Sequence, residues 1–201
     1  MTERVDVCNK ALSMLGEKAI TSIDEDSNNA QQLKIHYQTA RDGTLEAHQW
    51  SFAIHRFIPP SLVITPVYGY QFAFQPPPEI IRVLTAYNTD NIGAGIWNQI
   101  PESSRPQVDW VMENNLILCN DPIIYCRGIR RIEEEGRFSP LFVEAFAAKL
   151  AALVAINLTA SAEIQANMLN FFTAFVEQAK SRDGLQGRSK QFRNRQLQNV
   201  R

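Results

Sequence analysis

The sequence predicts an α+β protein with a four-helix core, an inserted and mostly antiparallel β unit, and a basic C-terminal tail. Three observations predict this class. Both ends of the chain carry apolar residues three and four positions apart, the middle alternates and is rich in turn residues, and the last residues are basic without any acid. The predicted units are a helical core of residues 1–49 and 139–184, a β-rich insertion of residues 50–138, and a flexible tail of residues 185–201.

The most apolar stretch, residues 140–158, predicts a buried helix that is either central to the fold or shared between subunits. Ser139 supplies an N-cap oxygen, and Pro140 fits the first helical position, where a missing N–H costs nothing. One face of this helix carries large residues, namely Phe142, Phe146, Leu150 and Leu153. A second face carries small residues that would let a backbone approach closely, and we expect it to pack against a neighbouring subunit: Ala145, Ala148, Ala152 and Ala155.

The same stretch does not predict a membrane span. Its longest uncharged run, residues 150–162, includes polar residues such as Asn157, whereas a bilayer requires about 20 predominantly apolar residues. The N-terminus also lacks the basic and apolar segments of a secretory signal. We therefore expect neither a membrane anchor nor a signal sequence.

Three further helices are predicted near residues 3–15, 29–48 and 162–182. The first two are expected to form a helical hairpin. The second has a regular inward stripe, made of Ala30, Leu33, Tyr37, Ala40, Thr44 and Ala47. The expected end residues are Thr2 and Gly16 for the first helix, Asn28 or Asn29 for the second, and Ser161 and Gly184 for the last.

The β unit is predicted from alternation and turn residues. Alternate aromatic residues predict a strand over Val67 to Phe74, whose aromatic face we expect to pack on the helices rather than to stack on sugars or nucleotides. Asn114 and Asn115 tolerate positive φ and predict a hairpin turn. The other predicted strands are Ser51 to Ile58, Ile80 to Tyr87, Trp110 to Met112, Leu116 to Cys119 and Pro122 to Arg127, and the predicted loop is Asn88 to Gln107.

Charge and cysteine content narrow the classes of function. Lys and Arg (20) nearly balance Asp and Glu (21), so the overall charge favours no nucleic-acid partner. Cys8, Cys119 and Cys126 form no metal-ligating or redox spacing, which predicts reduced thiols. No serine-hydrolase, zinc-protease, P-loop or dinucleotide-binding motif is present, so we expect no catalytic, cofactor or metal site and no enzyme.

Two alternative functions stay open on charged residues. The acidic runs Asp24 to Asp26 and Glu133 to Glu135 could supply carboxylates to a glycan hydrolase, although adjacent exposed acids lack the separate environments that such chemistry needs. A DNA-binding protein could use Arg127, Arg130 and Arg131, but the nearby acids would repel phosphates. The basic tail is better suited to docking onto a protein surface.

Six stretches, taken together and in order, resemble the tail tubular protein A family of short-tailed bacteriophages. They begin with ALSMLGEKAITSIDEDSNNA and RDGTLEAHQWSFAIHR, continue with FQPPPEIIRVLTAY, VDWVMENNLILCN and IIYCRG, and end with SPLFVEAFAAKLAALVAINLT (residues 11–30, 41–56, 74–87, 108–120, 123–128 and 139–159). No single stretch is diagnostic, and the resemblance spans nearly the whole chain.

This resemblance implies a structural virion protein made in the host cytoplasm. Members of the family form a twelve-membered head-to-tail adaptor ring between the portal protein and the tail nozzle protein, with the genome DNA passing through the centre without sequence recognition. We expect the helical part to form the ring and engage the portal, and the β unit to face the nozzle. Asp24, Glu25 and Asp26 are candidates for lining the channel, and the tail residues expected to bind the portal are Arg188, Lys190, Arg193, Arg195 and Arg201.

Overall fold

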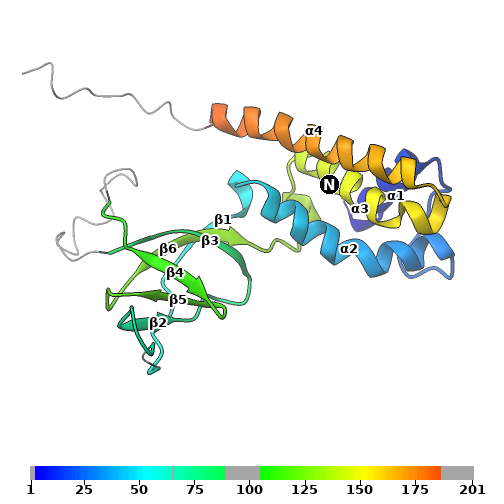
Figure 1. Cartoon of the computed structure of the whole chain (residues 1–201). Helices are drawn as coiled ribbons and strands as arrows, with labels where there is room; N and C mark the ends of the chain where they lie inside the picture. Colours follow the sequence, from blue (N-terminus) through cyan, green and yellow to red (C-terminus); the bar gives the residue numbers. More distant parts are fainter. Residues whose placement is uncertain (1–2, 65, 89–104, 187–201) are drawn as a thin grey trace, which may run out of the picture.

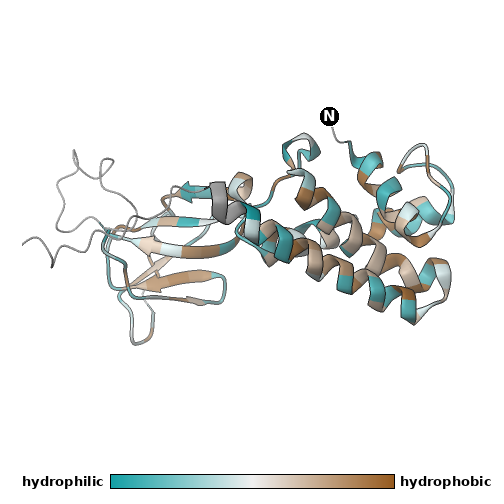
Figure 2. Cartoon of the chain, turned by 90° about the horizontal axis from the view of Figure 1, so that it is seen from above, coloured by the Kyte–Doolittle hydropathy of each residue, from teal (hydrophilic) through white to brown (hydrophobic). Residues whose placement is uncertain are grey.

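The computed structural model of the chain describes residues 3–64, 66–88 and 105–186. A helical bundle and a β unit lie end to end, as two views at right angles show (Figure 1, Figure 2). The chain enters the β unit after its second helix and returns to the bundle before its third. The predicted α+β class, with four helices and an antiparallel β insertion, is confirmed. Of the predicted tail, residues 185–201, the first two belong to the last helix, so the predicted start is wrong, and residues 187–201 lie outside the described residues.

Helix α3 (Pro140–Thr159) is the centre of the bundle. The backbone N–H of Phe142 donates to Ser139 Oγ at 3.3 Å, which confirms the predicted N-cap. The helix contacts α1 (Arg4–Leu15), α2 (Asn28–Ala47) and α4 (Ala162–Gln186), so it is buried on nearly every side. Its central position, predicted from apolar residues on two faces, is therefore confirmed.

Within the described residues, α3 is also the one helix long and apolar enough to cross a membrane. However, 61% of its most apolar 18-residue window is buried inside the protein. The core helix of a bundle meets the same length and composition criteria, because burial among neighbouring helices selects the same apolar residues.

The first residues of α1 and α2 differ from the prediction. Glu3 is the N-cap of α1, and it exchanges hydrogen bonds with Asp6 in a capping box, while the predicted cap Thr2 lies outside the described residues. Ser27 is the N-cap of α2, because its extended backbone places Oγ 3.2 Å from the N–H of Ala30. The predicted caps Asn28 and Asn29 are wrong, since both lie within the first turn.

Two helix ends test the predicted stop signals. Gly16 ends α1 with φ 74°, as predicted. The prediction that Gly184 ends the last helix is wrong, because α4 continues to Gln186. Ser161 does start that helix, since its Oγ accepts from the N–H of Ile164 at 3.3 Å.

The inward stripe of α2 is confirmed except at its last position. Ala30, Leu33, Tyr37, Ala40 and Thr44 are buried. Ala47 is exposed, and Leu45 is buried near the end of the helix instead. Both α1 and α2 pack mainly on α3 rather than on each other, so the predicted helical hairpin is wrong.

The β unit consists of two small antiparallel sheets. One has the order β1-β6-β3 and the other β2-β5-β4, and the side chains between them form a second apolar core. Asn114 (φ 49°) and Asn115 (φ 61°) form the predicted turn between β4 and β5. The strands are β1 (Ile54–Phe57), β2 (Phe72–Phe74), β3 (Ile80–Tyr87), β4 (Trp110–Glu113), β5 (Leu116–Cys119) and β6 (Tyr125–Arg130).

The predicted aromatic strand is wrong over most of its length. Only Phe72–Phe74 is a strand, because Gly69 adopts φ 85° and turns the chain before it. Tyr68 is 87% exposed, whereas Phe72 and Phe74 pack in the core between the two sheets. The expected packing of an aromatic face on the helices is therefore also wrong.

The helical core reaches into the two connections that link the bundle to the β unit. Trp50 and Ala53 before β1, and Ile132 and Phe138 after β6, are buried in the same apolar cluster as α3. The predicted limits at residues 50 and 138 therefore assign to the β unit side chains that pack with the helices. These connections anchor the β unit to the bundle.

Candidate interaction surfaces

The predicted subunit-packing residues are buried within the single chain. Ala145, Ala148, Ala152 and Ala155 of α3 are each at most 1% exposed. Such residues cannot touch a second subunit, because α3 is already surrounded by α1, α2 and α4. The prediction is therefore wrong for these residues, and the small side chains instead let neighbouring helices approach α3 closely. The predicted portal-binding residues Arg188, Lys190, Arg193, Arg195 and Arg201 lie outside the described residues.

The acidic residues 24–26 form a tightly bonded turn before α2. Glu25 is its centre, because it accepts from the N–H and the hydroxyl of Thr21 at 2.8 and 2.9 Å and from the hydroxyl of Ser27 at 2.8 Å. Asp24 pairs with Lys34 at 2.7 Å, and Asp26 accepts from the side chain of Gln31 at 3.3 Å. Glu25 therefore shapes the turn, and the proposed channel lining by these residues stays a prediction.

The hydrogen bonds to Glu25 lead to a prediction of how the stability of the protein changes at acid pH. The Thr21 N–H, followed by the Ser27 and Thr21 hydroxyls, lowers the pKa of Glu25 from 4.5 to about 2. A lowered pKa in the folded protein stabilises it above the unfolded value, and this stabilisation is lost as pH falls from 4.5 to about 2. In thermal unfolding measured at several pH values across this window, the stability of Glu25→Gln should fall less steeply with decreasing pH than that of the wild type. Glu46→Gln, at an exposed acid of α2, should keep the wild-type slope, and an equal slope for Glu25→Gln would contradict the assignment.

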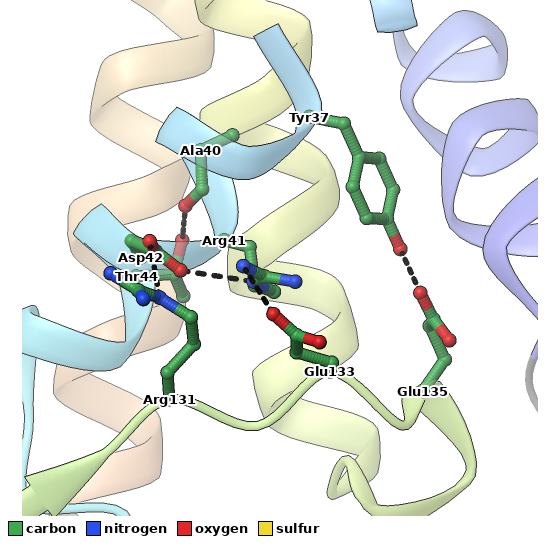
Figure 3. Close-up of polar contacts among 8 residues, drawn as sticks. All are labelled: Tyr37, Ala40, Arg41, Asp42, Thr44, Arg131, Glu133 and Glu135. Atoms are coloured by element: carbon green, nitrogen blue, oxygen red, sulfur yellow. Dashed lines mark hydrogen bonds and ion pairs between the residues drawn. The ribbon is translucent and has the colours of Figure 1, made fainter. Parts of the chain in front are cut away.

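A cluster of charged residues, here called the polar junction, joins α2 to the connection that follows β6 (Figure 3). Asp42 bridges two arginines, because its Oδ1 accepts from Arg41 Nε and its Oδ2 from Arg131 Nε, both at 2.9 Å. Arg41 is only 6% exposed, and its guanidinium lies 3.9 Å from Glu133. Thr44 donates to the carbonyl of Ala40 at 2.7 Å, a hydrogen bond within α2.

Tyr37 extends the polar junction along α2. Its hydroxyl donates to Glu135 at 3.0 Å, and its burial, followed by the nearby Glu135 carboxylate, raises the pKa of Tyr37. The guanidinium of Arg4 lies 4.3 Å from the centre of the Tyr37 ring. Alternate residues 131, 133 and 135 thus face α2, while the intervening Ile132 is buried in the helical core.

A cavity of about 380 Å³ adjoins the polar junction. Its walls carry three arginines and three glutamates, so it offers no net charge to an anion such as a DNA phosphate. Arg130 Nε is buried there without a hydrogen-bond partner among the described residues. The charged lining residues are Glu79, Arg130, Arg131, Glu133, Glu134 and Arg137.

An uncharged loop, described at residues 58–64 and 66–71, projects from the β unit below β2 in the view of Figure 1. Several of its large apolar side chains point into solvent, and Val63 and Val67 are almost completely exposed. A groove of about 330 Å³ separates this loop from β5, with Tyr70 and Leu118 among its lining residues. Contiguous apolar surface of this kind is typical of protein–protein contacts.

Comparison with protein families and with curated proteins adds no relative to this description. No protein-family model matches the chain, and no curated protein does. The polar junction, the uncharged loop and the faces of the bundle therefore have to be interpreted from their own chemistry.

The described acidic residues offer little support for a glycan hydrolase. Asp24 and Glu25 have lowered pKa values, whereas the general acid of a glycan hydrolase needs a raised one. The second acidic run is also divided, because Glu133 and Glu135 contact Arg41 and Tyr37 in the polar junction. No group of three or more potential metal ligands occurs within the described ranges.

The three cysteines are free and buried, as predicted for reduced thiols. Burial raises the pKa of Cys8 and of Cys126 to about 12, and it also raises that of Cys119. These thiols are therefore poor nucleophiles and fill space in the two cores. The sequence did not predict the polar junction, because its partners lie about ninety residues apart and carry no local pattern.

Proposed function

We propose that this chain is the subunit of a head-to-tail adaptor ring in a short-tailed bacteriophage virion, of the tail tubular protein A type. In this proposal the helical bundles pack side by side beneath the portal protein and the β units meet the tail nozzle protein. The observation that carries the proposal is the exposed apolar surface of the uncharged loop, which lies on the β unit and apart from the helical bundle (Figure 1). An adaptor needs separate surfaces on its two parts, since it joins two different partners.

The uncharged loop of the β unit supports the contact with the nozzle. Its exposed valines would be buried on docking, which provides a hydrophobic driving force of about 25 cal/mol per Å² of apolar surface. The loop lies on the β unit rather than on the bundle (Figure 1), so the nozzle and the portal would not compete for it. The six stretches of sequence that resemble the adaptor family supply the identity of these partners.

The charge distribution supports passage of DNA rather than binding to it. The chain as a whole is nearly neutral, and the cavity beside the polar junction carries arginines and glutamates in equal number. Asp24 and Asp26 stay exposed at the start of α2, where negative charge in a channel would let DNA slide. The ring would therefore conduct the genome without reading its sequence.

Electron microscopy of the chain, alone and mixed with the portal protein of the same genome, tests the proposal. We expect closed rings on the portal, and their symmetry gives the number of subunits. Removing residues 187–201 should leave the described fold intact and weaken portal binding by about tenfold or more, because five basic residues are lost. A chain that stays monomeric and ignores the portal would overturn the adaptor proposal.

A further inference from the structure

Helix α4 covers one side of the bundle and has an unusual outer face. Its extensive contacts with other helices are all with α3, so the opposite side of α4 faces solvent. From Ile164 to Val176 this helix carries no charged residue, although an outer helix of a soluble bundle normally has a charged face. Leu169 (41% exposed) and Phe171 (49% exposed) flank an outer surface of small and polar uncharged side chains, including Asn167, Asn170 and Thr173.

Helix α2 has a comparable face on the other side of the bundle. Ile35 is 67% exposed and points away from α3, since the buried stripe of α2 lies on the opposite side of the helix. Its exposed neighbours Gln31, Gln38 and Thr39 are uncharged. Lys34 is the nearest charge, and it pairs with Asp24 at 2.7 Å.

The two uncharged faces lie on opposite sides of α3. Figure 1 shows α4 above α3 and α2 below it, and α3 contacts both. One copy of the chain cannot bring these faces together, whereas two copies related by a rotation can. A contact between two different surfaces of identical subunits is heterologous, and it forms a closed ring when the rotation closes.

We propose that the outer face of α4 in one copy packs on the outer face of α2 in the next. This contact would bury Phe171 against Ile35 without burying an unpaired charge, which is the arrangement that a stable interface requires. It replaces the buried alanines of α3 as the surface between subunits. The inference rests on the proposed ring and names the two faces that build it.

Cysteine cross-linking tests the contact directly. The native thiols are buried, so a short bismaleimide should react mainly with introduced cysteines. Mixing Ile35→Cys chains with Phe171→Cys chains should give about tenfold more cross-linked dimer than either variant alone, because the heterologous contact pairs position 35 only with position 171. Ser13→Cys, on the exposed side of α1, replaces Ile35→Cys as the control and should give only background dimer with Phe171→Cys.

A charge variant separates this inference from the adaptor proposal. Phe171→Glu should weaken self-association by about tenfold or more, and it should leave the circular dichroism of the single chain unchanged because the side chain is half exposed. Rings on the portal without the 35–171 cross-link would overturn the inference and leave the adaptor proposal standing. Cross-linking in a chain that ignores the portal would support the inference and overturn the adaptor proposal. Loss of portal binding with unchanged self-association would assign the α4 face to the portal and overturn the inference.

Discussion

Replacing Phe142 by alanine is expected to lower the free energy of unfolding by about 3–5 kcal/mol. Phe142 is completely buried near the start of α3, where its ring lies 5.0 Å from that of Trp50 and 4.6 Å from that of Phe138. Phe52 and Phe146 also contact it, at 5.2 and 5.8 Å between ring centres. These aromatic residues come from α3 and from both connections to the β unit, so one cavity would loosen all three segments.

Urea denaturation followed by circular dichroism measures this effect. Phe171→Ala is the matched control at concentrations where the chain is monomeric, because it removes the same side chain from a half-exposed position on α4 and should cost less than about 1 kcal/mol. Phe142→Leu should give an intermediate loss, since it leaves part of the volume filled. Equal losses for Phe142→Ala and Phe171→Ala would show that the aromatic cluster is not the main anchor of the bundle.

Replacing Asp42 by alanine is expected to cost about 2–3 kcal/mol of stability. The change removes the carboxylate that both Arg41 and Arg131 contact at 2.9 Å. Arg41 would then be nearly buried, with Glu133 at 3.9 Å as its remaining ion-pair partner among the described residues. The expected cost is below that of a fully buried ion pair because Asp42 and Arg131 retain 27% and 38% exposure of their side chains.

Glu133→Gln is the matched control for the polar junction. Glu133 is 75% exposed and lies at the longer distance, so its loss should change stability by only about 0–1 kcal/mol. Chemical denaturation of both variants, at low and at high salt, gives the comparison. If Glu133→Gln costs as much as Asp42→Ala, the assignment of Asp42 as the central bridge is wrong.

Local signals in the sequence predicted the elements that local chemistry determines. Ser139 and Ser161 start their helices, and Asn114 with Asn115 turns the β4–β5 hairpin, since each acts on backbone groups only a few residues away. The heptad-like stripe of α2 was visible for the same reason. Ser27 was missed because three successive residues could each cap a helix, and only the backbone conformation chooses among them.

Features that depend on distant residues were not predictable from such signals. The alanines of α3 were expected at a subunit contact because no local pattern in the sequence indicates that α1, α2 and α4 together surround this helix. Alternating tyrosines indicated a strand, but Gly69 allows the chain to turn there. The polar junction requires Asp42 and Arg131 to meet across the whole β unit, which no periodic pattern encodes.

The insertion of the β unit between α2 and α3 also affects the order in which the chain can fold. Helices α1 and α2 are separated from α3 by the entire β unit, so their contacts with α3 close a very long loop and carry a large entropic cost until the ends of that loop are held together. The antiparallel pairing of β1 with β6 brings those two ends side by side. A nascent chain would therefore complete its bundle after the β unit has formed, and fold more slowly than a four-helix protein with short connections.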